Sequence, residues 1–122
     1  MTDASLDYLT EADLLDIAFG VVGEVAVRDR GLLASAAARP RSSAFGEDAY
    51  PTFAAKAAAL MHAIARNHAL IDGNKRLAWA TTRIFCLLNR RDLDLTVDEA
   101  EALLVAVAAG KLEVASIETH LV

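Results

Sequence analysis

Helix-breaking residues are scarce in this chain, and this scarcity constrains its fold more than any other feature of the sequence. Of 122 residues, 2 are proline and 6 are glycine. Alanine, the residue with the highest helix propensity, recurs along the whole chain. A chain of this length forms one domain with a sizeable core. The sequence therefore predicts an all-α fold: a compact helical bundle that forms a single domain over residues 1–122.

Capping signals and turn residues divide the chain into helices. Thr10 with Asp13, and Thr96 with Glu99, have the spacing of a capping box, in which each side chain accepts from the other residue's backbone N–H. Asn89 is expected to end a helix in the left-handed conformation. The expected helices cover residues 11–21, 31–37, 52–67, 74–88, 97–110 and 114–121.

The stretch from Arg39 to Tyr50 differs from the rest of the chain. It combines proline, serines, a glycine and charged residues with two aromatic residues, Phe45 and Tyr50. Such a composition is typical of connecting segments at the surface. We expect a loop or a short hairpin there.

Charge and cysteine content exclude several classes of function. Twelve basic and 17 acidic residues leave a net charge of −5, so no direct DNA binding is expected, because DNA-binding domains present a basic face. A single cysteine, Cys86, excludes an internal disulfide and a multi-cysteine metal site. Its apolar neighbours predict a buried, unreactive thiol.

Features of a targeting or membrane segment are missing from the sequence. The start, Met1–Ser5, is acidic where a secretory signal would be basic. Charged residues, Arg66, Asp72 and Lys75, interrupt the most apolar region before it reaches the length of a membrane span. We therefore expect a cytoplasmic protein that does not contact a membrane.

The segment from Arg66 to Arg76 contains the residues best suited to chemistry. A histidine at the end of one predicted helix precedes an acid, a glycine, an asparagine and two bases at the start of the next. The free N–H groups and the dipole of that second helix attract anions, phosphates above all. Beside phosphates, Asp72 suits Mg²⁺, and His68 suits a general base. Together these groups are typical of phosphoryl or nucleotidyl transfer.

A simpler interpretation of the same segment stays open on spacing alone. Turns between helices are often rich in aspartate, glycine and asparagine, and Asp72 and Asn74 would then only cap a helix. The segment is also not a Walker A loop, because that loop's first glycine and its Ser/Thr after lysine are missing.

A family resemblance favours the chemical interpretation. The segment reads His68-Ala69-Leu70-Ile71-Asp72-Gly73-Asn74-Lys75-Arg76, which resembles the Fic/Doc signature His-x-Phe-x-(Asp/Glu)-Gly-Asn-(Gly/Lys)-Arg. The similarity extends to the Doc (death on curing) toxin branch. The segment from Val27 to Leu33 is similar to that branch's Arg-Asp-x-Gly-Leu-Leu. Phe45-Gly46 and Tyr50 are similar to its target-docking flap. The motif's usual phenylalanine is Leu70 here.

The resemblance implies a role for each motif residue. His68 would deprotonate a protein hydroxyl, and Asp72 would hold Mg²⁺. The implied catalytic residues are His68, Asp72, Lys75 and Arg76. The implied nucleotide-binding residues are Arg66, Gly73, Asn74, Lys75 and Arg76, with ATP and Mg²⁺ as cofactors.

The resemblance leaves more than one reaction open. Doc toxins phosphorylate a threonine of elongation factor Tu, which blocks protein synthesis, whereas many Fic enzymes transfer AMP. AMP-transferring members carry a second arginine where this chain has Trp79, and this difference, with Lys75, favours a Doc-like protein kinase. Trp79 itself is expected in the core, with a platform for the nucleotide as the alternative. The alternatives are an AMP transferase and a catalytically silent partner-binding module of the same fold.

The resemblance also implies a toxin–antitoxin partnership. Many Fic proteins carry an inhibitory helix with the pattern Ser/Thr-x-x-x-Glu-Gly/Asn, and the partial match at Ser43–Glu47 is interpreted as chance. Restraint would then come from a cognate antitoxin, whose disordered C-terminal tail folds on binding. The apolar stripe of the first helix is a candidate receptor, with residues Leu14, Ile17, Phe19 and Val21. The alternative is that all four residues belong to the core.

Overall fold

Six α-helices and one small hairpin make up residues 6–121, which are the residues described by a computed structural model of the protein. The all-α prediction is therefore confirmed. Met1–Ser5, whose acidity argued against a secretory signal, lie outside the described residues. The elements are α1 (Glu11–Val21), α2 (Arg30–Ala38), a 3₁₀ turn (Arg39–Arg41), β1 (Ser43–Ala44), β2 (Glu47–Asp48), α3 (Phe53–Asn67), α4 (Asn74–Leu88), α5 (Val97–Ala108) and α6 (Val114–Glu118).

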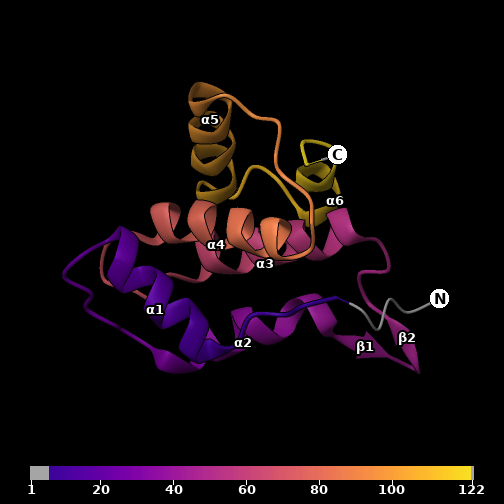
Figure 1. Ribbon diagram of the computed structural model, residues 1–122, viewed down its shortest axis with the longest axis horizontal. Helices are drawn as coiled ribbons and strands as arrows, with labels where there is room; N and C mark the ends of the chain where they lie inside the picture. The colour runs from indigo at the N-terminus through magenta and orange to yellow at the C-terminus, as the bar shows by residue number, and fades with distance from the viewer. Residues whose placement is uncertain (1–5, 122) are drawn as a thin grey trace.

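Helix α3 lies at the centre of the molecule and contacts α2, α4, α5 and α6. Alanines along α3 are buried and let the neighbouring helices approach closely, among them Ala57, Ala58 and Ala65. Figure 1 shows α3 and α4 side by side, with α5 standing across them on one face and α1 and α2 on the other. The turn that joins α3 to α4 therefore lies close to parts of α1 and α5.

Both predicted capping boxes are present, at Thr10 and at Thr96. Asn89, however, does not close α4 in the left-handed conformation. Its φ is −101°, and the next residue, Arg90, has the positive φ of 64°. The Asn89 side chain instead exchanges hydrogen bonds with the backbone of Asp7, at 2.7 and 2.9 Å. This tertiary contact between the chain start and the end of α4 explains the difference.

The sequence predicted a buried Cys86 and left the α1 stripe open between a receptor and a core role. Cys86 is buried, and burial raises the pKa of its thiol to about 11, as expected of an unreactive cysteine. Within the α1 stripe, Leu14 is a core residue, whereas the Phe19 side chain is 56% exposed. None of the described helices has the length and apolar character needed to cross a membrane.

The sequence predicted a loop or a short hairpin between α2 and α3, and the structure has a hairpin with a two-residue turn. Phe45 and Gly46 occupy that turn with φ of 55° and 79°, the conformation that suits a tight hairpin. Phe45 is fully exposed at the tip.

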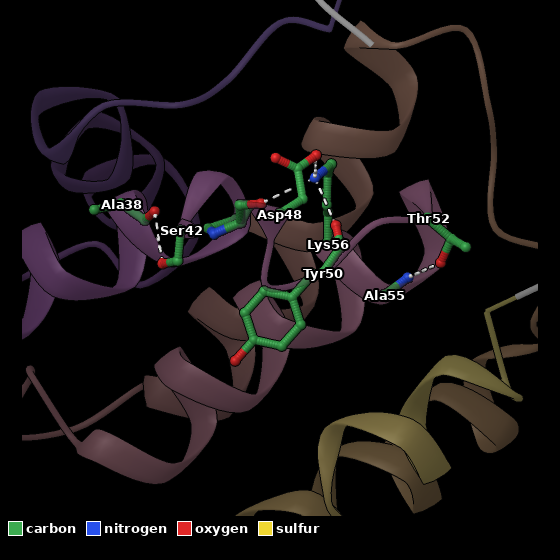
Figure 2. A network of polar contacts seen from close by, with 8 residues as sticks. Ala38, Ser42, Asp48, Tyr50, Thr52, Ala55 and Lys56 are labelled. Carbon is green, nitrogen blue, oxygen red and sulfur yellow. Dashed lines mark hydrogen bonds and ion pairs between the residues drawn. The ribbon is translucent and has the colours of Figure 1, made fainter. Parts of the chain in front are cut away.

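A buried lysine holds the base of this hairpin. Lys56 on α3 is 2% exposed, and its Nζ donates to the carbonyl of Tyr50 at 2.6 Å and of Pro40 at 3.4 Å. Its third contact is an ion pair with the Asp48 carboxylate at 3.3 Å. Figure 2 shows the Lys56 side chain beside Asp48 and Tyr50. A buried ammonium is stable only when it is paired in this way.

Replacing Lys56 by methionine is expected to loosen the hairpin and to lower the free energy of unfolding by roughly 1–3 kcal/mol, because its acceptors lose their donor. Urea denaturation measures the change. Lys111→Met, at an exposed lysine, is the matched control and should leave stability nearly unchanged. An equal effect of both substitutions would contradict the role of Lys56.

A second network joins the hairpin base to α3. Arg39 Nε donates to the Tyr50 hydroxyl at 2.9 Å, and Arg39 Nη1 lies 2.8 Å from His62 Nδ1. A guanidinium only donates, so Nδ1 accepts and the other ring nitrogen faces Glu113 at 3.4 Å. Burial, followed by the positive charge of Arg39, lowers the pKa of His62.

The lowered pKa of His62 predicts a pH dependence of stability. The folded protein binds the proton of His62 less readily than the unfolded chain, whose histidine pKa is about 6.5. Protonation therefore favours unfolding, and the free energy of unfolding should fall as the pH drops below about 6.5. His62→Gln should flatten this decline in urea denaturation between about pH 7.5 and pH 5.5. A variant with the same slope as the original protein would exclude His62 as the cause.

Candidate active site

The candidate site is built around the turn between α3 and α4. Helix α3 ends at Asn67, and His68 follows in the left-handed conformation with φ 53°. Histidine is one of the few residues that adopt this conformation with some frequency. Gly73, with φ 89°, then leads into α4. Two left-handed residues thus bracket the turn and reverse the direction of the chain.

A segment before α2 packs along this turn and holds it. Val27 and Leu70 form an antiparallel bridge, and the N–H groups of Arg28 and Asp29 both donate to the carbonyl of Ala69. The Arg28 guanidinium also donates to the carbonyl of His68, from Nη2 at 2.6 Å and from Nε at 2.9 Å. Arg28 therefore fixes the backbone of His68. The sequence placed Arg28 in the family resemblance but assigned it no role.

Asn74 holds the other side of the turn. Its Oδ1 accepts from the N–H of Leu70 at 3.0 Å, and its Nδ2 donates to the carbonyl of the same residue at 2.9 Å. Both Asn74 and Leu70 are buried. The Asn74 side chain therefore shapes the turn from inside, and Leu70 fills the core position where the family motif usually has phenylalanine.

The start of α4 offers its backbone N–H groups to a ligand. Within the described residues, no side chain caps this helix start. Uncapped N–H groups and the helix dipole favour an anion at this position. Lys75 and Arg76, both exposed, add two full positive charges.

One cavity of about 580 Å³ brings the predicted motif residues together. It is lined by Ala65, His68, Ile71, Asp72, Gly73, Asn74, Lys75, Arg76, Glu101 and Ala108. The last two residues come from α5. Glu101 adds a carboxylate that sequence reasoning missed, because nothing in the pattern of α5 distinguishes it from an ordinary exposed acid.

Asp72 is a carboxylate of this cavity that could hold Mg²⁺ together with oxygens of a bound ligand. Within residues 6–121, no group of three or more His, Cys, Asp or Glu side chains could hold a metal by itself. Asp72 is exposed, and its Oδ1 accepts from the N–H of Gly73 at 2.9 Å. Mg²⁺ in nucleotide sites is typically bound by one or two carboxylates together with phosphate oxygens. The donor set at Asp72 meets this requirement.

Two sets of predicted site residues lie outside the lining of this cavity: Arg66, and the flap residues Phe45, Gly46 and Tyr50. Arg66 donates from Nη1 to the Ala108 carbonyl at the end of α5, at 3.1 Å. The hairpin with Phe45 and Gly46 lies before the start of α3, whereas the cavity lies at its end (Figure 1). The 15 residues of α3 separate them by about 22 Å. Tyr50 anchors the hairpin base through Arg39 and Lys56.

Arg28→Met is expected to lower the turnover number of any reaction that uses His68 by about 10- to 100-fold, because small misplacements of a reacting group slow catalysis strongly. The KM for a phosphate-containing substrate should change little, since Arg28 contacts the backbone of His68 and Asn67. Arg30→Met is the matched control: Arg30 pairs with Glu11 at 2.7 Å. Equal turnover of the two variants would exclude the positioning role.

Comparison of the sequence with known proteins identifies a family. The model of the Fic/DOC family matches residues 8–86, which include all of α3, the whole turn and α4 up to Cys86. The chain is also 48% identical over 120 residues to a protein named Toxin Doc from Mycolicibacterium smegmatis (strain ATCC 700084 / mc(2)155). That alignment covers 94% of this chain and 91% of the relative. The chain therefore belongs to the Fic/DOC family.

Proposed function

We propose that this protein is the toxin of a toxin–antitoxin pair and transfers the γ-phosphate of ATP to a threonine of elongation factor Tu. One observation carries the proposal: a single cavity is lined by a histidine, an exposed carboxylate and the uncapped, doubly basic start of a helix. The similarity to a protein named Toxin Doc supports the toxin role. Blocking a translation factor would account for toxicity.

In the proposed reaction the threonine oxygen attacks the γ-phosphorus, and the bond from that phosphorus to the β-phosphate oxygen breaks. ADP leaves with the bond's electron pair. His68 takes the hydroxyl proton. The N–H groups at the start of α4, with Lys75 and Arg76, bind the phosphates and stabilise their charge. Asp72 would hold Mg²⁺, which neutralises charge on the phosphates.

Two features favour phosphate transfer over AMP transfer. Lys75 occupies the motif position where AMP-transferring relatives commonly have glycine. Trp79 occupies the position of their second arginine. In those relatives this arginine binds the phosphates of a nucleotide held for AMP transfer, and here an uncharged indole replaces it. The same residues therefore support a nucleotide bound in the reverse orientation, with its γ-phosphate near His68.

Labelled ATP distinguishes the candidate reactions. Purified protein is incubated with elongation factor Tu, Mg²⁺ and ATP labelled at either the α- or the γ-phosphate. Label on the factor from the γ-phosphate alone is expected. Label from the α-phosphate would establish AMP transfer instead. No label from either position, with folded protein, would favour the silent partner-binding module.

An antitoxin is the second part of the proposal. A kinase that acts on the translation machinery must be inhibited when the cell grows. The short match to the family's inhibitory helix lies in the hairpin, where Ser43–Ala44 is a strand, so this segment does not form such a helix. We propose that the C-terminal tail of a cognate antitoxin folds against α1, where Phe19 is exposed. Expression of the protein alone in a bacterium should halt growth, and His68→Ala should relieve the arrest. Unimpaired growth with soluble, active protein would overturn the need for an antitoxin.

A further inference from the structure

A second cavity, of about 570 Å³, lies between α4 and α5 and adjoins the candidate active site. Lys75, Arg76 and Glu101 line both cavities. The remaining lining residues of the second cavity are Trp79, Arg83, Leu93, Leu95, Val97, Ala100, Leu104 and Val105. We call this space the α4–α5 hollow.

The α4–α5 hollow has the composition of a site for a small ligand. Such sites are largely apolar with a few polar groups that orient the ligand. Here the apolar wall comes from α5 and the segment before it, and Val97 is 82% exposed at the rim. The cations at the shared end are exposed, whereas Arg83 at the other end is paired with Asp92 at 3.3 Å. The hollow therefore suits a ligand with an anionic end and an apolar body.

Trp79 supplies the flat surface in this hollow. The sequence favoured a core position over a surface for the nucleotide, and Trp79 does pack against the core, but it is only partly buried and also lines the cavity. It follows Lys75 by four residues, so both side chains project from the same face of α4. The rise between them along the helix axis is about 6 Å. This distance corresponds to the sugar that separates the base of a nucleotide from its first phosphate.

We propose that the α4–α5 hollow binds the base of the nucleotide, with the Trp79 indole as its stacking surface; this inference rests on the proposed function. The phosphates occupy the start of α4, and the base extends along α4 toward Trp79. The nucleotide enters the shared end beside Lys75 and Arg76. Stacking on an aromatic side chain contributes to binding because every base has a flat π face.

The intrinsic fluorescence of the protein tests this proposal without any activity assay. Trp79 is the single tryptophan of the chain, so indole emission excited beyond the adenine absorption band reports on this position. ATP is expected to change the emission in the presence of Mg²⁺. Inorganic tripolyphosphate carries the phosphates without a base, so it should compete with ATP but leave the emission unchanged.

Calorimetric titration of the same two ligands measures the contribution of the base. ATP should bind more tightly than tripolyphosphate by about 5- to 100-fold, the range expected for stacking of one base. Trp79→Leu should remove this difference, whereas Trp79→Phe, which keeps a ring, should retain part of it. Leu88→Ala is the matched control, because Leu88 is a half-exposed residue on α4 that does not line the hollow.

The outcomes separate this inference from the proposed function. Equal affinities for ATP and tripolyphosphate, with unchanged indole emission, would overturn the base site alone and leave the hollow to a protein partner. Failure of both ligands to bind the original protein would overturn the proposed function and the base site together. The fluorescence measurement uses the unmodified chain, so it stays decisive even where Trp79→Leu does not fold.

Discussion

Replacing His68 by glutamine is expected to slow phosphate transfer to elongation factor Tu by about 10²- to 10⁴-fold, the contribution typical of a general base. Glutamine is close in size but cannot take the hydroxyl proton. The start of α4, which would bind the phosphates, is unchanged, so the affinity for ATP should stay the same. Transfer of label from the γ-phosphate and calorimetric titration with ATP measure the two quantities separately.

The control for His68 is His120→Gln. His120 is exposed near the end of the chain, where its Nδ1 lies 3.0 Å from the carbonyl of Ser116, and its replacement should leave the rate unchanged. If His68→Gln transferred phosphate at the original rate, His68 would not be the base. If it lost ATP binding as well, His68 would instead belong to the nucleotide site.

Replacing Gly73 by alanine is the second large expected effect, because two independent costs coincide there. The φ of 89° lies in the left-handed region, which costs a residue with a Cβ roughly 1–2 kcal/mol. A Cβ at Gly73 would also lie 2.7 Å from Val22 Cγ2 and 2.8 Å from Val22 Cγ1. Either Val22 or the turn must shift to accommodate it, and we expect the strained left-handed residue to displace the turn and with it the N–H groups of α4. We expect ATP binding to weaken at least 10-fold, by roughly 1.4 kcal/mol or more.

Two further variants separate these costs. Gly46→Ala is the matched control, because Gly46 has a similar φ of 79° but no atom within 4 Å of the added Cβ. It should lower stability modestly and leave ATP binding intact. Combining Gly73→Ala with Val22→Ala removes the clash and should restore part of the binding. Normal ATP binding by Gly73→Ala alone would show that the turn does not need glycine.

Local signals account for the parts of the fold that the sequence predicted well. Both capping boxes and the ends of α3 and α4 depend on residues that are neighbours in the chain. The turn with its histidine, acid and glycine is also contiguous, so its residues could be recognised from spacing and family resemblance. The left-handed residue after α4 was predicted wrongly, since Asn89 bonds to Asp7, which lies far away in the sequence.

The other residues of the candidate site could not be predicted because they come from distant segments. Arg28 reaches the carbonyl of His68 across 40 residues, and Glu101 enters the cavity from α5. The exposure of Trp79 likewise depends on how α5 packs against α4. Helical spacing shows that Trp79 and Lys75 share one face of α4, but it contains no information about what covers that face.

The sequence by itself thus determined the helical class, the starts of the helices to within one residue and the contiguous turn that would bind phosphate, because helix propensity, capping and short motifs act between near neighbours. The last two helices end earlier than expected, at Ala108 and Glu118. Only the tertiary structure decided which distant groups complete the site. The hairpin shows the difference most clearly. Local composition predicted a loop or a short hairpin, but the position of the hairpin a full helix length from the cavity follows from the rigid length of α3 and from the buried contacts of Lys56.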